Sequence, residues 1–254
     1  MRRFWLFGIP SLIAVSLTSC ESVSGRAYVG FFRPEVAGET ALDTSAGGLD
    51  LATRQVDVED ELGIDPTESI WAKAVIEPFD YGRFSVSAFR YDDESGGGLQ
   101  SGYGDFAAGT SVNSDFSFDN LKLAYTYDIV DAGVFYFGPG VAVDIFDINQ
   151  RVSVVTSESL ETTVAVPMLY AQAGANLGVA ELALEAGWMS LDFDDARGTY
   201  WDLEANLFVS VAPHVELVAG YRFISIDGDG IADGRRFDAD IELRGWFIGG
   251  GISF

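Results

Sequence analysis

The sequence predicts an all-β protein, a transmembrane antiparallel up-and-down β-barrel of about ten strands, within a range of roughly eight to twelve. Three observations support this fold: an export signal at the amino terminus, strands that alternate apolar and polar residues, and a carboxyl terminus that ends in an aromatic residue. The 254 residues are 48% hydrophobic and 13% aromatic, which suits one β-rich domain.

Residues 1–19 have the layout of a signal peptide. Two arginines, Arg2 and Arg3, precede an apolar stretch from Phe4 to Leu17. That stretch is too short to span the hydrocarbon core of a membrane, so it predicts export and not anchoring by a helix. Residues 20–254 then remain as a single barrel domain.

Cys20 is the only cysteine, and Leu17-Thr18-Ser19-Cys20 resembles a bacterial lipobox. We therefore expect cleavage before Cys20 and a lipid on its sulfur. The alternative is ordinary cleavage a few residues later. In either case the mature chain has no pair of cysteines for an intramolecular disulfide.

Removal of the signal takes the net charge from −24 to −26, because the segment holds two arginines and no acid. A chain this acidic repels phosphate groups, and we therefore expect no nucleic acid partner. No later segment reaches about 18 consecutive apolar residues, which excludes transmembrane helices. A closed barrel is then the remaining way for the chain to cross a membrane. It needs no long apolar run, because lipid-facing and lumen-facing residues alternate along each strand.

The alternation is clearest in the carboxyl-terminal half. Leu182, Leu184 and Trp188 fall on one face of a strand, whereas Glu181 and Glu185 fall on the other. The expected strands span residues 25–33, 68–78, 81–92, 114–128, 131–148, 160–175, 179–192, 197–212, 214–226 and 236–254. Short and long connections alternate between them, which predicts that both termini lie at a periplasmic rim.

The carboxyl terminus carries Gly249, Ile252 and Phe254. This pattern resembles the signal by which the barrel-assembly machinery recognises outer-membrane proteins, so we expect that machinery as a partner during biogenesis. Ile252 shares its parity with the charged residues Asp240 and Glu242. A bulge at Gly245 or in the triple glycine that follows would restore the lipid-facing phase.

Five segments carry a resemblance to a known family. They are Val56-Asp57-Val58-Glu59-Asp60-Glu61-Leu62-Gly63-Ile64-Asp65, Asp115-Phe116-Ser117-Phe118, Leu121-Lys122-Leu123-Ala124-Tyr125-Thr126-Tyr127, Pro167-Met168-Leu169-Tyr170-Ala171 and Gly220-Tyr221-Arg222. The chain resembles, from about residue 25 onward, a family of Gram-negative outer-membrane β-barrel proteins described only as uncharacterised. That family is distantly similar to small barrels of the outer-membrane protein W type. The resemblance implies an outer-membrane location and defines no catalytic residue.

Charged residues fall on the polar faces of several expected strands. The bases are Lys73, Lys122, Arg222 and Arg244, and the acids that we expect opposite them are Asp144, Glu181, Glu185, Asp202, Glu204 and Glu242. We expect a lumen plugged by a salt-bridge network, because side chains largely fill a barrel of about eight to ten strands. The alternative is a charged constriction that selects ions.

His214 is the only histidine, so a hydrolase with a Ser-His pair could use no other residue. It is expected in a periplasmic turn beside Pro213, whereas lipid-modifying barrels work at the outer rim. We therefore expect no enzymatic activity and no cofactor.

Acidic loops could collect divalent cations weakly. Asp227-Gly228-Asp229-Gly230 hints at a calcium loop, but the EF-hand spacing and its closing glutamate are absent. We expect solvated loops and no metal site. Trp71, Trp188 and Trp201 are expected in the aromatic girdles at the membrane interfaces.

These observations predict a non-enzymatic, monomeric outer-membrane barrel, surrounded by lipid, with an envelope-structural or narrow-passage role. The alternative is a channel or transporter for small hydrophobic molecules or cations. A weaker alternative is an adhesin or receptor that uses the acidic loops.

Overall fold

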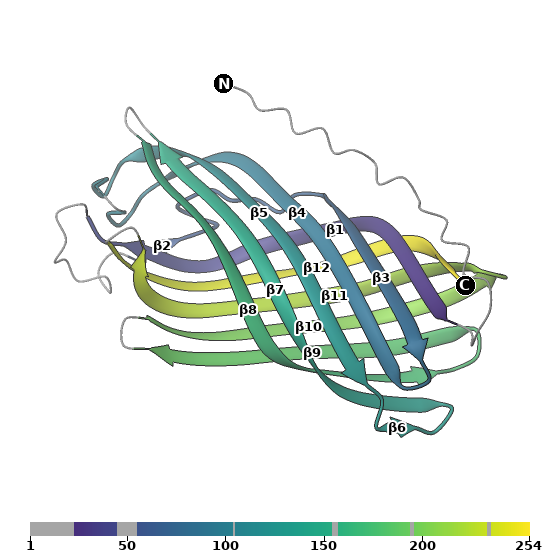
Figure 1. Ribbon diagram of the computed structural model, residues 1–254. Helices are drawn as coiled ribbons and strands as arrows, with labels where there is room; N and C mark the ends of the chain where they lie inside the picture. Colours follow the sequence, from purple (N-terminus) through teal and green to yellow (C-terminus); the bar gives the residue numbers. More distant parts are fainter. Residues whose placement is uncertain (1–22, 45–54, 104, 154–156, 194–195, 233–234) are drawn as a thin grey trace.

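A computed structural model of the protein describes residues 23–44, 55–103, 105–153, 157–193, 196–232 and 235–254 (Figure 1). The expected signal peptide and Cys20 lie outside these ranges. Within them, no helix is long and apolar enough to cross a membrane.

Ten long strands form one closed antiparallel barrel, as the alternation predicts. They are β1 (Ser24–Leu42), β3 (Ser69–Phe79), β4 (Gly82–Gly98), β5 (Ser111–Tyr127), β7 (Phe135–Ser153), β8 (Ser157–Asn176), β9 (Ala180–Phe193), β10 (Ala196–Ala212), β11 (Val215–Ala232) and β12 (Arg235–Ser253). Each pairs with the next long strand, and β12 closes the barrel against β1. Two further strands have two residues each: β2 (Val56–Asp57), which pairs with β1, and β6 (Val130–Asp131), which pairs with β7.

Both ends of the described chain lie at one end of the barrel, which we call the near end. Gly25 and Phe254 exchange two backbone hydrogen bonds of 2.9 Å there. The turns at this end are tight, and three have a residue in the left-handed backbone region: Gly133, Gly178 and His214, the last with φ of 62°. The opposite end, which we call the far end, carries the two longest connections, from β1 to β3 and from β4 to β5. The other three connections there span only two or three residues, so the alternation of short and long connections that the sequence predicts holds only in part, because the strands extend into the expected loops.

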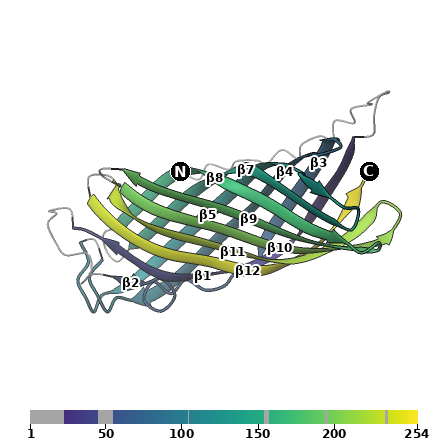
Figure 2. The same cartoon turned by 90° about the horizontal axis from the view of Figure 1, so that it is seen from below.

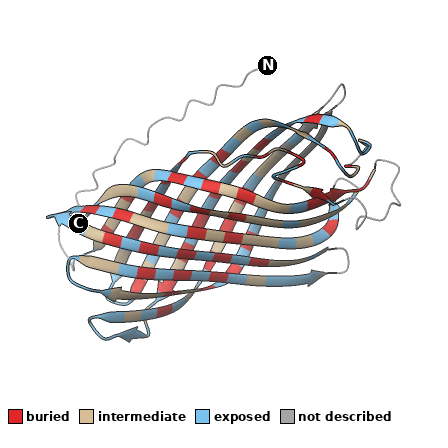
Figure 3. Ribbon diagram, turned by 180° about the vertical axis from the view of Figure 1, so that it is seen from behind, coloured by how far each residue is buried: buried red, intermediate tan, exposed pale blue. Residues whose placement is uncertain are grey.

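An apolar belt surrounds the near half of the barrel. Buried and exposed residues alternate along the strands (Figure 3). The outward side chains of the belt include Val29, Phe31, Ile70, Leu123, Val141, Leu169, Leu182, Leu184, Leu203, Leu207, Leu217 and Ile248. A face this apolar requires lipid and not water, which defines the membrane-spanning part of the barrel. Trp188, Trp201, Tyr221 and Trp246 are exposed where the belt gives way to polar residues, as expected of an interfacial girdle.

The strands continue beyond the belt, and in this far section the polarity of the two faces is reversed. Leu243 on β12 is 4% exposed and joins an apolar interior with Val36 and Ile224. The neighbouring Arg244 points outward, with 43% of its side chain exposed. Several strands are therefore longer than the alternation predicts, because the polar outward residues of the far section read as loops.

The far section also splits into two sheets (Figure 2). The pairing of β1 with β3 covers only Ser24 to Phe32 on β1. The pairing of β8 with β9 covers only Leu169 to Asn176 on β8. Beyond these points, one sheet holds β9 to β12 with β1, and the other holds β3 to β8.

The expected bulge in β12 is absent, and that prediction is wrong. β12 pairs with β1 and with β11 along its length without a register shift. Ile252 and Glu242 share the outward face because Ile252 lies at the near end, where that face is apolar, whereas Glu242 lies in the far section, where it is polar. The switch in polarity replaces the switch in register that the sequence suggested.

Candidate functional site

Seven charged side chains gather in the middle of the lumen, and we call them the lumenal charge cluster. They are Lys73, Lys122, Asp144, Glu185, Asp202, Glu204 and Arg222. Each comes from the inward face of a strand at the level where the outside is apolar, on β3, β5, β7, β9, β10 and β11. Their side chains are 0 to 3% exposed. All seven belong to the set that the sequence predicts.

The two lysines bridge opposite walls of the barrel. Lys73 Nζ lies 2.7 Å from Glu204 Oε1 and also donates to Glu185. Lys122 Nζ lies 2.8 Å from Asp202 Oδ2 and 3.2 Å from Glu204 Oε2. A third carboxylate, that of Glu185, lies 3.8 Å from Lys122 Nζ. Each ammonium therefore has at least two carboxylates beside it, which compensates much of the cost of removing the charges from water.

Arg222 completes the cluster on β11. Its Nε and Nη2 atoms donate to the two oxygens of Asp202 at 3.0 and 3.1 Å, and Nη1 donates to Asn120 Oδ1 at 3.0 Å. The amide of Asn120 in turn donates to Asp144 at 3.0 Å. The planar guanidinium thus has defined partners in several directions, which fixes its orientation.

The cluster holds four carboxylates and three bases. Two tyrosine hydroxyls supply further donors to the acids: Tyr200 donates to Asp144 at 2.5 Å, and Tyr170 donates to Glu185. Because the acids outnumber the bases by one, neutral donors of this kind supply hydrogen bonds that the three bases alone do not provide.

An aromatic layer closes the lumen on the far side of the charge cluster. The rings of Trp71 and Phe247 stack with centroids 4.5 Å apart, and those of Phe32 and Phe89 meet edge to face at 5.0 Å. The Arg222 guanidinium lies 5.3 Å from the centroid of Phe89, which joins the aromatic layer to the charges. Trp71 is 1% exposed, so the prediction that it lies in the outer girdle is wrong.

The residues after β2 fold over the far end of the barrel. Leu62 and Ile64 are buried there, and the carboxylate of Glu61 accepts hydrogen bonds from the backbone N–H groups of Gln100 and Ser101 at 2.5 and 3.2 Å. Tyr91 on β4 donates to the backbone oxygen of Asp65 at 2.5 Å. The far end therefore carries an apolar cover that polar contacts hold in place.

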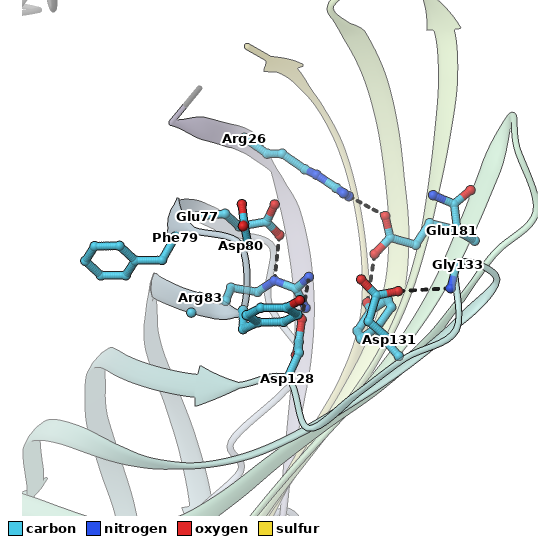
Figure 4. Close-up of a pocket in the computed structure, with 13 residues that line it drawn as sticks. Arg26, Glu77, Phe79, Asp80, Arg83, Asp128, Asp131, Gly133 and Glu181 are labelled. Carbon is cyan, nitrogen blue, oxygen red and sulfur yellow. Dashed lines mark hydrogen bonds and ion pairs between the residues drawn. The ribbon is translucent and has the colours of Figure 1, made fainter. Parts of the chain in front are cut away.

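A polar cavity of about 200 Å³ lies at the near end (Figure 4). Arg26 and Glu181 face each other across it at 2.5 Å, and Tyr136 donates to Glu181 at 2.8 Å. Arg83 lies 2.7 Å from Glu77 and 3.7 Å from Asp128. None of the residues that line this cavity belongs to the lumenal charge cluster, so the cavity forms a vestibule outside the filled part of the lumen.

Asp128 lies in the turn after β5, outside the membrane-spanning part of the barrel. Burial raises its pKa, against the opposing effect of the guanidinium of Arg83. The nearby carboxylates of Glu77 and Asp131 raise the pKa further.

Three of the predicted network residues lie outside the cluster. Glu181 belongs to the near-end vestibule, where it pairs with Arg26. Glu242 and Arg244 lie on the outer surface of the far section, where Arg244 is 2.9 Å from Glu35 and 3.8 Å from Glu242. They are absent from the lumen because the inward face of β12 at that level is apolar.

The sequence reasoning missed Asn120, Tyr170, Tyr200 and the vestibule residues Arg26 and Arg83. A signal was present for two of them. Asn120 precedes Lys122 by two residues, and Tyr200 precedes Asp202 by two, so each shares the inward face of a charged residue.

The remaining candidates lie apart from the lumen. His214 is exposed in the near-end turn, with Nδ1 2.9 Å from the backbone oxygen of Ser253. Asp227 and Asp229 lie on the outward face of β11, opposite Asp240 and Asp238 of β12. Among the residues that the structure describes, no group of histidine, cysteine or acidic side chains is arranged to hold a metal ion. Of the assembly-signal residues, Ile252 and Phe254 are exposed at the near end, whereas Gly249 lies against the backbone of Val29 and Gly30.

No family model matches the chain, and no curated protein matches it. The chain is similar to several solved structures. The outer-membrane protease OmpT from Escherichia coli is similar at a TM-score of 0.54 and 9% identity, over 92% of this chain and 98% of OmpT. Ail, the attachment invasion locus protein of Yersinia pestis, covers 92% of this chain and 100% of its own at 11% identity and a TM-score of 0.39.

Neisserial surface protein A is similar at 13% identity and a TM-score of 0.36, over 91% of this chain and 97% of its own. The likeness to OmpT supports the fold of a bacterial outer-membrane β-barrel and carries no activity to this chain. The finer likeness to the outer-membrane protein W type stays a prediction.

Proposed function

We propose that the protein is a non-conducting, non-enzymatic barrel of the bacterial outer membrane with an envelope-structural role. Its near end is then periplasmic and its far end extracellular. The barrel is monomeric, with outer-membrane lipid around its belt and the assembly machinery as its partner during biogenesis.

The observation that carries this proposal is the burial of the lumenal charge cluster. A conducting pore needs charges that water can reach, whereas Asp144, Asp202 and Glu204 have side chains that are 0% exposed. The aromatic layer and the far-end cover lie in series with this cluster. Three layers of filled lumen favour a closed barrel over the narrow passage for cations or hydrophobic molecules that the sequence left open.

The outer-membrane location rests on three features that agree. The fold is that of bacterial outer-membrane barrels, the outward belt requires lipid, and residues 1–19 are expected to direct export. Both ends of the described chain share one rim and the two longest connections lie at the other, which is how the periplasmic and outer rims are arranged in such barrels.

The absence of catalysis is proposed from the position of His214. The only histidine lies in a near-end turn, far along the strands from the cluster, and its ring contacts a backbone oxygen and not a nucleophile. No cofactor is proposed.

Planar bilayer recordings test the closed lumen. We expect the purified barrel to give no conductance steps. Because the three layers lie in series, a conducting variant must open all of them. Lys73→Ala with Glu204→Ala removes one base and one acid without changing the net charge, and we expect it to conduct only in combination with Trp71→Ala and Phe247→Ala in the aromatic layer and Leu62→Ala and Ile64→Ala in the far-end cover. Arg83→Ala in the vestibule is the matched control and should stay closed, because it lies outside the seal. Stable conductance of the unaltered barrel would refute the proposal.

A further inference from the structure

The far half of β8 has no strand partner on one of its edges. β8 pairs with β7 from Ser157 to Ala175, but it pairs with β9 only from Leu169 to Asn176. Over residues 157–168, the described chain therefore leaves the β9 side of β8 without a ladder. The two strands diverge toward the far end (Figure 1). We call the space between residues 157–168 of β8 and residues 189–193 of β9 the seam.

The seam uncovers side chains that belong to the interior. Val164 lies on the inward face of β8, like Val166 and Met168, and Leu191 lies on the inward face of β9. Val164 and Leu191 are nevertheless 40% exposed, whereas Val166 is 7% and Met168 is 4% exposed. Free backbone groups along a strand edge, with apolar side chains beside them, form a template for another extended segment.

The chain fills the corresponding opening on the other side of the barrel by itself. β1 stops pairing with β3 after Phe32, and the short strand β2 pairs with β1 further along, at Glu39 and Thr40. Val56 of β2 is fully buried by this pairing. One opening of the far section is thus already closed by an added strand, and the seam offers the same backbone geometry without one.

The charge around the seam selects the partner. Residues 157–168 contain Glu158 and Glu161 and no base. Asp192 on β9 is exposed beside the seam, and Asp227 and Asp229 are exposed two strands further on β11. The bases nearby are Arg197, which lies on β10 between Asp192 and Asp229, and Arg151 on β7, opposite Ser159, so acids outnumber bases around the seam. Two copies of so acidic a surface repel each other, which disfavours pairing between barrels, whereas a basic segment is attracted.

We propose that the seam binds an extended basic peptide, which adds as a strand to the free edge of β8 and covers Val164 and Leu191 with alternate apolar side chains. About twelve residues of edge at about 3.3 Å each leave room for a segment of six to ten residues. This proposal concerns the outer surface of the far section and does not depend on whether the lumen conducts.

The test uses a fluorescein-labelled peptide, Lys-Val-Lys-Val-Lys-Val-Lys, with the full-length barrel in a non-ionic detergent, and measures fluorescence anisotropy. We expect saturable binding. A peptide methylated on alternate backbone nitrogens keeps its charge but loses donors to the strand edge, so its affinity should fall by about tenfold or more. Replacement of lysine by glutamate in the peptide should abolish binding.

Two charge-reversed barrels form a matched pair for the same measurement. Asp192→Lys lies at the seam, and Asp240→Lys lies on β12, on the outer surface away from it, with an identical change in net charge. We expect the first variant to weaken binding at least about fivefold and the second to leave it within about twofold. A benzophenone on the central valine of the peptide should crosslink to residues of β8 or β9.

Several outcomes would overturn strand addition at the seam: no saturable binding, equal affinity of the methylated peptide, an equal effect of the two variants, or crosslinks that map elsewhere. Pairing of two barrels through β8, seen as a crosslinked dimer that excludes the peptide, would overturn it as well. Cleavage of the bound peptide would refute the non-enzymatic proposal while supporting the docking site.

Discussion

Arg222 and Asp202 form a bidentate pair inside the barrel wall, with Nε to Oδ1 at 3.0 Å and Nη2 to Oδ2 at 3.1 Å. The two residues lie on neighbouring strands, β11 and β10, and both side chains are within 1% of complete burial. Such a pair holds the two strands in register as well as balancing charge, because a fork of two parallel hydrogen bonds fits in only one alignment.

Removal of Arg222 should destabilise the barrel strongly. Arg222→Met leaves Asp144 without its nearest base and Asp202 with Lys122 alone, and we expect the free energy of unfolding to fall by about 3 to 5 kcal/mol. The measurement is urea unfolding in lipid vesicles, followed by tryptophan fluorescence. Arg197→Met is the control, because its pair with Asp229 spans 3.8 Å between exposed side chains, and it should cost less than about 1 kcal/mol. Equal effects of the two variants would show that the lumen is hydrated.

Neutralisation of Glu204 should also destabilise the barrel. Glu204 contacts Lys73 and Lys122, so Glu204→Gln leaves two buried ammonium groups with fewer counter-charges. We expect a lower unfolding midpoint in urea. Glu242→Gln on the outer surface serves as the control and should leave the midpoint nearly unchanged. A harmless Glu204→Gln would indicate that water reaches the cluster.

The two halves of β11 should respond oppositely to an outward arginine. Leu217 is 51% exposed in the apolar belt, and Leu217→Arg should cost about 2 to 4 kcal/mol near the bilayer midplane. Asp227→Arg occupies the same face of the same strand beyond the belt and should be tolerated. Unfolding of both variants in vesicles measures the difference, and a harmless Leu217→Arg would contradict the position of the belt.

Asp238 should destabilise the far section at neutral pH. Burial raises its pKa, and the carboxylates of Asp229, Asp227 and Asp240 raise it further. Its ionised form is therefore disfavoured in the folded state, so the destabilisation is present above the raised pKa and fades as the pH falls through it. We expect Asp238→Asn to stabilise the barrel by up to about 1 kcal/mol at neutral pH and by nothing at low pH.

The control for this pH dependence is Asp92→Asn on β4. Asp92 is exposed and lies 3.8 Å from Arg90, so neutralising it removes an attraction that offsets its repulsion of Asp119. It should give no stabilisation at any pH. Thermal unfolding in detergent at several pH values compares the two variants.

Closure of the barrel should be visible on a gel. Unboiled and boiled samples are expected to migrate differently, because a barrel closed by β1 and β12 has no long free edge in its membrane-spanning part from which to unfold. Identical migration would argue against a closed barrel.

The sequence predicts the wall of the barrel better than its contents. Leu184 and Glu185 fall on opposite faces in any strand, so alternation alone assigns one to lipid and the other to the lumen. Lys73 is among the bases that the sequence places opposite Glu185, but which of those bases makes the contact could not be predicted, because the distance across a barrel depends on shear and tilt.

Arg244 shows the other limit of the sequence. The alternation shows which residues share a face of the strand with Arg244. Whether that face contacts lipid, the lumen or water depends on where the membrane ends along the strand. Trp71 is different, since it precedes Lys73 by two residues and a strict application of period two places both on the inward face. A general preference of tryptophan for membrane interfaces led to the wrong location.

The reversal of polarity along β11 has a consequence for membrane thickness. Leu217, Ala219, Tyr221 and Phe223 have one parity, whereas the apolar residues that follow, Ile224 and Ile226, have the other. One residue inserted between Phe223 and Ile224 would bring the apolar residues on both sides of the insertion to the same face. The outer face of the strand would then be apolar well beyond the hydrocarbon core. The bilayer would have to thicken, or the strand to tilt, to cover it. The point at which the apolar residues change faces therefore fixes the length of the lipid-facing segment of β11, and with it the depth at which the barrel lies in its membrane.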